Sequence, residues 1–404
     1  PLPRPSMGAR HFAASVPGTR HRVKAYAVFR ALKRRNDERP WMAWEEERDI
    51  DDRGIERLWK RKNLIAETRF YVWMQMRLAE QFSAAARSLD GSGIALKGDI
   101  PILINEDSAD AWADRDVFRP ELRAGAPPDM FSELGQNWGF PIYNWMTLEK
   151  RDYDWWRRRL DVASRYYHAY RIDHVLGFFR IWAVPAGNFS GIPGFFWPQH
   201  GISREELYEI GFDDGRIRWL REPHMPEDLL VRELGRDTLD TLVGQSGILQ
   251  RLGDEDLFLF SPDVTGEQCL AELDLSEEAK NALLEHFRDR TLVELPDGTL
   301  APTWTFRQCS RYQGLTEGER DRFEALVARA AVQSNELWAD HGRTILKVMK
   351  ESSDMLPCAE DLGVVPEAVP RVLQSLGILG LKIPRWTHYW DQPGQPLVPF
   401  GEYP

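Results

Sequence analysis

Two carboxylates follow apolar segments that lie far apart in this chain of 404 residues. Asp173 belongs to the motif Arg171-Ile172-Asp173-His174, and Glu360 to Ala359-Glu360-Asp361-Leu362-Gly363. Retaining cleavage of a glycosidic bond uses two such groups, one ionised as nucleophile and one protonated as acid and later base. The pair therefore predicts chemistry on sugars.

The neighbours of each carboxylate predict different charge states for the two groups. Arg171 and His174 flank Asp173, and because a nearby cation favours the ionised form, Asp173 is predicted to be the nucleophile. In a strand, Arg171 and Asp173 also point to the same face. Glu360 follows an apolar run, where desolvation would raise its pKa, so it is predicted to be the acid/base. For either carboxylate alone, helix capping or pairing with an arginine is the simpler interpretation.

Helix-like and strand-like segments alternate around these motifs, as is typical of α/β proteins. Strand patterns occur at 94–104, 169–173, 355–360 and 379–383, and helical spacing at 25–32, 54–87, 154–168, 335–349 and 367–376. Residues 1–22 are predicted to be a mobile leader, and 185–335, where the alternation is lost, an inserted subdomain between 23–184 and 336–404. Within 23–184, residues 105–150 are predicted to form a long loop that binds substrate.

Composition excludes several classes of function. A formal charge of −11 without a basic tract argues against a nucleic-acid partner. No run approaches the roughly 18 apolar residues of a spanning helix, so no membrane association is predicted. The three cysteines form no metal-ligand or disulfide pattern, which predicts no zinc site and a reducing, cytoplasmic location. No metal or cofactor is predicted, because glycosyl transfer needs only the two carboxylates and positioning groups.

Aromatic residues are unusually frequent, with 16 Trp, 19 Phe and 11 Tyr. Sugar rings present apolar C–H faces that stack on aromatic planes, so such residues suit a saccharide groove. For most of them burial in a core is the simpler interpretation.

At these residues the sequence resembles the amylomaltases, also called 4-α-glucanotransferases or disproportionating enzymes. The resemblance covers most of the chain and rests on motifs in the family's order: Gly98-Asp99-Ile100-Pro101-Ile102, Glu106-Asp107-Ser108-Ala109-Asp110-Ala111-Trp112, Pro127-Pro128-Asp129-Met130-Phe131, Gly135-Gln136-Asn137-Trp138-Gly139, and the two carboxylate motifs. The long stretch after Phe178-Phe179-Arg180-Ile181-Trp182 resembles the insertion of the plant-cytosol type, disproportionating enzyme 2.

The resemblance implies a (β/α)8 barrel of the TIM type and retaining transfer of glucosyl units between α-1,4-glucans or maltooligosaccharides. By motif position Asp173 is the nucleophile and Glu360 the acid/base. The implied substrate-binding residues are Arg171, His174, Asp107, Asp129, Phe131, Gln136 and Trp138. Asp361 is predicted to join them by turning toward the substrate from its loop.

The chain departs from the family pattern at both ends. The family's third carboxylate comes from a His-Asp motif beyond a segment resembling Phe400-Gly401-Glu402-Tyr403-Pro404, where this chain stops, and Asp391 is a poor substitute. With about four central strands the barrel is predicted to be incomplete. Two alternatives to transfer therefore stay open: hydrolysis, as in α-amylase-like relatives, and glucan binding without turnover. Oligomeric state is not encoded.

Overall fold

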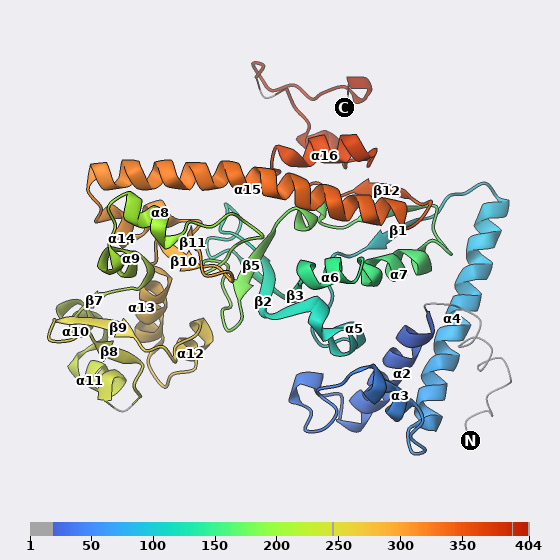
Figure 1. Cartoon of the computed structure of the whole chain (residues 1–404), viewed down its shortest axis with the longest axis horizontal. Coiled ribbons are helices and arrows are strands. Elements are labelled where there is room, and N and C mark those ends of the chain that lie inside the picture. Colours follow the sequence, from blue (N-terminus) through green and yellow to red (C-terminus); the bar gives the residue numbers. More distant parts are fainter. Residues whose placement is uncertain (1–18, 245, 390, 403–404) are drawn as a thin grey trace. The chain divides into compact units, whose positions relative to one another are not determined.

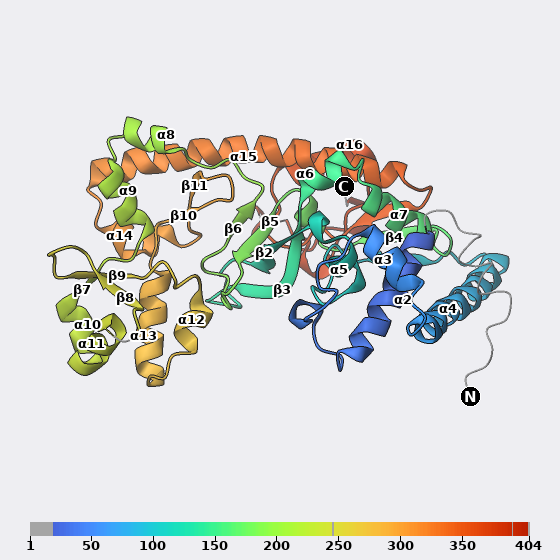
Figure 2. The same cartoon turned by 60° about the horizontal axis from the view of Figure 1, so that its bottom comes forward.

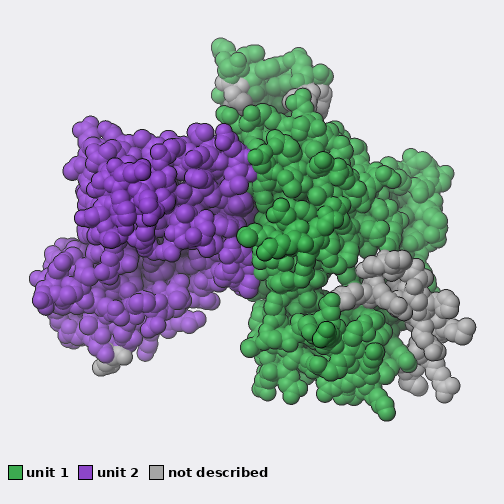
Figure 3. All heavy atoms as spheres, in the orientation of Figure 1, with its two compact units in different colours: residues 1–118, 144–179, 339–404 green, residues 119–143, 180–338 purple. Residues whose placement is uncertain are grey.

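The computed structural model describes residues 19–244, 246–389 and 391–402, and the chain divides into two compact units (Figures 1 and 3). Unit 1 comprises Pro1–Phe118, Asn144–Phe179 and Ala339–Pro404, and unit 2 comprises Arg119–Tyr143 and Arg180–Trp338. The stretch 185–335 thus lies in unit 2, together with 119–143. Across the described ranges, no helix has both the length and the apolar character that crossing a membrane requires.

Unit 1 is a mixed α/β structure. Its helices are α2 (Thr19–Arg35), α3 (Asp52–Trp59), α4 (Ile65–Gly91), α5 (Ala109–Ala113), α6 (Trp145–Lys150), α7 (Asp154–Ala163) and α16 (Ala368–Leu376), and its strands are β1 (Lys97–Ile100), β4 (Ala169–Ile172) and β12 (Leu356–Ala359). The 35-residue α15 (Glu317–Glu351) begins in unit 2 and ends in unit 1. Helix α2 starts inside the predicted leader, whose residues 1–18 lie outside the described ones.

The strands of unit 1 form one parallel sheet in the order β1-β4-β12. The expected fourth strand at 379–383 is wrong, because Leu379 makes only an isolated parallel bridge to Cys358. The Leu381 N–H instead donates to a carboxylate oxygen of Asp361 at 2.8 Å. This local bond takes the backbone donor that a continuing ladder would need.

Alternation along the strands separates the two faces of the sheet. Ile100, Tyr170, Ile172 and Ala359 are buried on one face. On β1 the same face carries Gly98, where a Cβ would lie 2.2 Å from the Tyr167 ring, so only glycine fits. The other face carries Asp99 of β1 and Arg171 of β4, which lie opposite each other in the register.

Aromatic residues contribute to the core of unit 1, as expected for most of them. Helices α2 and α3 bury Phe29 and Leu58 beside Trp44 and Trp112, and the rings of Phe29 and Trp112 lie 5.7 Å apart. The Trp112 indole N–H also donates to the Glu47 carbonyl at 2.9 Å.

Unit 2 contains three small sheets, of which the four-stranded one runs in the order β3-β2-β5-β6 (Figure 2). Its elements are β2 (Phe118–Ala126), β3 (Gln136–Tyr143), β5 (Ile181–Pro185), β6 (Phe195–Trp197), α8 (Arg204–Glu209), α9 (Asp214–Arg221), β7 (Met225–Pro226), α10 (Glu227–Leu234), α11 (Arg236–Gly244), β8 (Leu249–Arg251), β9 (Leu257–Phe260), α12 (Glu267–Ala271), α13 (Glu277–Arg288), β10 (Leu292–Glu294), β11 (Leu300–Pro302) and α14 (Ser310–Gln313). Two clusters of buried apolar side chains form cores within unit 2, one that includes Phe323 and one that includes Leu283.

The prediction that 105–150 is a loop was wrong for much of its length. The segment contains α5, β2, β3 and α6, and β2 pairs antiparallel with β5, Leu122 facing Pro185 and Gly125 facing Trp182. Pro120 and Gly125 weaken the local strand signal, and the partner strand lies about 60 residues away in the sequence. Pairing at that distance is decided by tertiary structure, which composition does not reveal.

Candidate active site at the carboxyl ends of parallel strands

The two carboxylates predicted from sequence come together at one edge of the parallel sheet in unit 1. Asp173 follows β4 and Glu360 follows β12, and these strands are neighbours. The Asp173 N–H donates to the Ile100 carbonyl at 3.3 Å, and the Glu360 N–H to the Ile172 carbonyl at 2.9 Å. These bonds extend the ladder past the strands and fix the backbone of both residues.

Arg171 connects the acidic groups of this edge. One terminal nitrogen of its guanidinium lies 2.8 Å from Asp99 Oδ1 and 2.8 Å from Asp173 Oδ1. The other lies 3.9 Å from Glu360 Oε2. The hydrogen bond to Asp99, with Asp173 adding to it, raises the pKa of Arg171. The expectation that Arg171 and Asp173 share a face is confirmed.

Asp99 was not among the residues singled out as a site from sequence, although its motif was. It lies opposite Arg171 in the register of β1 with β4, and Cys358 of β12 lies opposite Arg171 on the other side. The sequence did place this acidic residue in a motif at the end of a predicted strand. Its partner became evident only from the register.

Glu360 is the more enclosed carboxylate, with 14% of its side chain exposed against 36% for Asp173. Burial raises the pKa of Glu360, although a backbone hydrogen bond from His174 and the charge of Arg171 act in the opposite sense. The predicted direction of this shift is confirmed. Its largest cause is desolvation by burial, the effect that the sequence predicted.

His174 contributes through its backbone. Its N–H donates to Glu360 Oε2 at 2.8 Å, and its φ of +48° places a non-glycine residue in the left-handed region. Such a conformation costs about 1 kcal/mol or more and occurs where surrounding structure enforces it. Burial lowers the pKa of the His174 imidazole. A role for that ring in holding sugar hydroxyls stays a prediction.

Two other predicted residues of unit 1 use their carboxylates to hold local structure. Asp361 accepts the Leu381 N–H. Asp107 forms an ion pair with Lys33 and accepts the Trp41 N–H at 3.2 Å on its other oxygen. These contacts fix the segments on which both residues lie, and substrate binding by either one stays a prediction.

The remaining predicted residues lie in unit 2, with Asp129 and Phe131 on the connection between β2 and β3, and Gln136 and Trp138 in β3 itself. Asp129 Oδ1 accepts the N–H groups of Phe131 and Ser132 at 2.9 and 2.8 Å, which forms a tight turn. Phe131 is 87% exposed and so does not serve a core. Gln136 accepts the Trp138 indole N–H at 2.8 Å. The turn therefore presents an aromatic ring to solvent from a rigid base.

Comparison with known proteins agrees with the motifs. A family described as 4-alpha-glucanotransferase, glycoside hydrolase family 77, matches residues 6–404. The chain is 33% identical over 347 residues to the rice (Oryza sativa subsp. japonica) 4-alpha-glucanotransferase DPE2, covering 82% of this chain and 35% of that protein. It is 33% identical over 257 residues to the 4-alpha-glucanotransferase of Chlamydia pneumoniae, covering 64% of this chain and 42% of that protein.

Among solved structures, the amylomaltase of Streptococcus agalactiae in complex with acarbose aligns over 48% of this chain and 40% of its own, with 26% identity and a TM-score of 0.43. The chain thus spans less than half the length of these relatives. The resemblance inferred from the sequence motifs is confirmed by the match along almost the whole chain. The chain belongs to the 4-alpha-glucanotransferase family, glycoside hydrolase family 77.

Proposed function

We propose that this chain carries the nucleophile and the acid/base of a retaining 4-α-glucanotransferase acting on maltooligosaccharides or α-1,4-glucans. The observation that supports this most directly is the single guanidinium of Arg171, which contacts Asp173 and lies within 3.9 Å of Glu360. Two carboxylates beside one cation at the ends of neighbouring strands support double displacement, in which one carboxylate acts ionised and the other protonated.

In the first step Asp173 attacks the anomeric carbon of the donor sugar, and the glycosidic bond breaks. The departing oxygen takes a proton from Glu360, whose raised pKa favours the protonated form that this step requires. The product is a glucosyl ester of Asp173 and a shortened glucan with a free 4-hydroxyl group.

In the second step Glu360, now ionised, takes the proton of an acceptor's 4-hydroxyl group. That oxygen attacks the anomeric carbon, and the Asp173 carboxylate is released. Arg171 holds the carboxylate of Asp173 in place throughout, and Asp99 holds Arg171 from the opposite side. The His174 N–H keeps Glu360 aimed by bonding one of its oxygens.

We further propose that β1, β4 and β12 are part of a (β/α)8 barrel, and that residues 185–335 form a subdomain inserted into it. Three parallel strands whose carboxyl ends carry the reactive groups support the barrel proposal. The assignment of 185–335 to unit 2 supports the insertion. The free thiols Cys269, Cys309 and Cys358 are compatible with a reducing cytoplasm.

Incubation of the chain with maltotriose, followed by chromatography, tests the proposal. Oligosaccharides both longer and shorter than maltotriose are expected, and Asp173→Asn should remove them. Asp340→Asn is the matched control, because Asp340 is 79% exposed on α15 and pairs only locally with Arg343. Glucose and maltose without longer products would support hydrolysis instead, and maltotriose left intact would contradict catalysis by this chain.

A further inference from the structure

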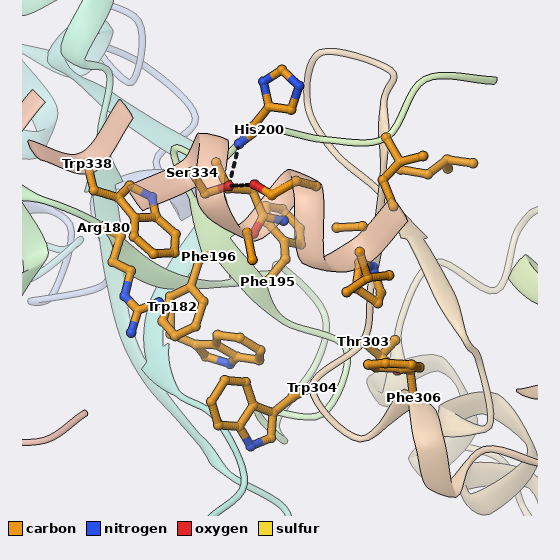
Figure 4. Close-up of a pocket in the computed structure, with 18 of the residues that line it drawn as sticks. Arg180, Trp182, Phe195, Phe196, His200, Thr303, Trp304, Phe306, Ser334 and Trp338 are labelled. Atoms are coloured by element: carbon orange, nitrogen blue, oxygen red, sulfur yellow. Dashed lines mark hydrogen bonds between the residues drawn. The ribbon is translucent and has the colours of Figure 1, made fainter. Parts of the chain in front are cut away.

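Unit 2 contains an aromatic cavity that the proposed transfer does not use. It encloses about 410 Å³, within the range of roughly 300–1,000 Å³ typical of small-molecule sites. Its wall is built from β5, β6, the segment after β11, and α15 (Figure 4). The term aromatic cavity refers below to this space and its four principal rings: Trp182, Phe196, Trp304 and Trp338.

The rings of the aromatic cavity meet edge to face, forming a corner (Figure 4). Trp304 stands at 78° to Trp182 and at 81° to Phe196, with ring centroids 5.9 and 5.8 Å apart. A chain of α-1,4-linked glucose units curves, so successive sugars turn their C–H faces in different directions. Within this corner Trp304 is the ring that a ligand can reach, because 43% of it is exposed against 4% of Trp182, so one sugar of such a curved chain can stack on it.

Backbone hydrogen bonds fix the orientation of the indoles. The Nε1–H groups of Trp182, Trp304 and Trp338 donate to the carbonyls of Gly191, Pro128 and Pro198, at 3.0, 3.0 and 2.6 Å. Trp182 and Trp338 are buried and form the back of the cavity, whereas the exposed Trp304 is held in place and loses little conformational entropy when a ligand stacks on it. The cavity is therefore organised before binding.

Trp304 differs from an ordinary core residue, because 43% of it is exposed although its N–H is anchored. Its anchor, Pro128, directly precedes the turn that carries Met130 and Phe131, which are 88% and 87% exposed. Exposed large apolar side chains that gather beside a cavity are typical of binding surfaces.

The charges of the aromatic cavity suit binding rather than cleavage. Of the described residues that line it, none is a carboxylate, so the groups needed to break a glycosidic bond are lacking. The Arg180 guanidinium lies 3.7 Å from the Phe196 ring centroid and 4.3 Å from that of Trp338. Arg307, the other arginine of the lining, pairs with Glu324, so the charges around the cavity disfavour a cationic ligand and are compatible with a neutral one.

We propose that the aromatic cavity binds a segment of α-1,4-glucan without turnover, as a saccharide site separate from the carboxylates of unit 1. The choice of glucan as the ligand rests on the transfer function proposed above. The ring corner, the anchored indoles and the lack of lining carboxylates are independent of it.

Electrophoresis of the whole chain through gels with and without amylopectin tests this site. The unaltered chain should be retarded by amylopectin, and not by hydroxyethyl cellulose at the same concentration. Trp304→Ala should weaken the apparent affinity about tenfold, as expected for loss of a stacking anchor, and Trp304→Phe less. Trp73→Ala is the control, since Trp73 is 38% exposed on α4 and does not line the cavity. Circular dichroism melting of each variant verifies that it folds.

Equal retardation of Trp304→Ala and Trp73→Ala would overturn the proposal, as would a lack of retardation of the unaltered chain. The maltotriose assay, run on the same preparations, keeps the two proposals separate. If products form while retardation does not depend on Trp304, only the proposal of the glucan site is contradicted. Retardation that depends on Trp304 in a chain without products would remove only the transfer function.

Discussion

Two arginines show how differently the two units treat the same side chain. Arg171 lies among carboxylates at the edge of the parallel sheet, and hydrogen bonding to Asp99 raises its pKa. Arg180 lies among the rings of the aromatic cavity, and burial lowers its pKa to about 10. The first cation is stabilised by opposite charge, whereas the second lies over the negative faces of aromatic rings.

The proposed reactive groups and the proposed glucan site therefore depend on different structural features of the chain. Asp173 and Glu360 lie at the ends of parallel strands, where backbone hydrogen bonds fix the main chain of each residue. The aromatic cavity depends on side chains that extend from a sheet, a turn and a helix. Variants of the carboxylate edge should therefore change rates, and variants of the rings should change retention on glucan.

Trapping the covalent intermediate is the most direct test of the roles proposed for Asp173 and Glu360. With α-maltosyl fluoride as donor, Glu360→Gln should accumulate a maltosyl ester on Asp173. Fluoride leaves without a proton from an acid, whereas transfer to an acceptor still needs the missing base. Turnover of maltotriose by the same variant should fall by about 10³-fold or more, in line with the loss of an acid/base.

Mass spectrometry of a peptide digest locates the added maltosyl unit. A modified peptide containing Asp173 is expected from Glu360→Gln and none from Asp173→Asn. Modification at another carboxylate would show that the nucleophile has been assigned wrongly.

Sequence reasoning succeeded where chemistry is local. Arg171 and Asp173 alternate onto one face, and the apolar run before Glu360 explains its raised pKa, so both could be predicted. Asp99 could not, because its contact depends on strand register across about 70 residues of sequence. For the same reason β2 was mistaken for loop, since its pairing with β5 is not encoded nearby.

A second variant removes the acid that holds Arg171 and leaves Glu360 in place. Asp99→Asn should lower kcat of maltotriose disproportionation about tenfold, since a buttressing charge-assisted hydrogen bond contributes roughly 1.5 kcal/mol. The freed guanidinium can then move closer to Glu360, from which it lies 3.9 Å in the intact site. A closer cation lowers the pKa of Glu360.

The pH profile distinguishes this positioning role from general damage. Protonated Glu360 is needed in the first step, so the alkaline limb of kcat/KM follows its pKa and should move to lower pH in Asp99→Asn. Asp340→Asn should leave that limb unchanged. A slower enzyme with an unshifted alkaline limb would show that Asp99 supports only the fold.

The pH dependence of stability tests whether burial or hydrogen bonding dominates at Glu360, and we expect it to change less than the rates. The folded pKa of Glu360 lies above its unfolded value, so its stabilising contribution is complete at low pH and is lost as pH rises through the folded pKa. Glu360→Gln carries no charge to bury and keeps an acceptor for the His174 N–H. Its Tm should match that of the unaltered chain near pH 4 and exceed it at neutral pH.

Scanning calorimetry across this pH range measures the difference in Tm. Glu351→Gln is the control, because Glu351 is 57% exposed on α15 and its substitution should leave the Tm unchanged at every pH. A lower Tm for Glu360→Gln at neutral pH would mean that the contacts with His174 and Arg171 outweigh desolvation, and that the site holds Glu360 ionised.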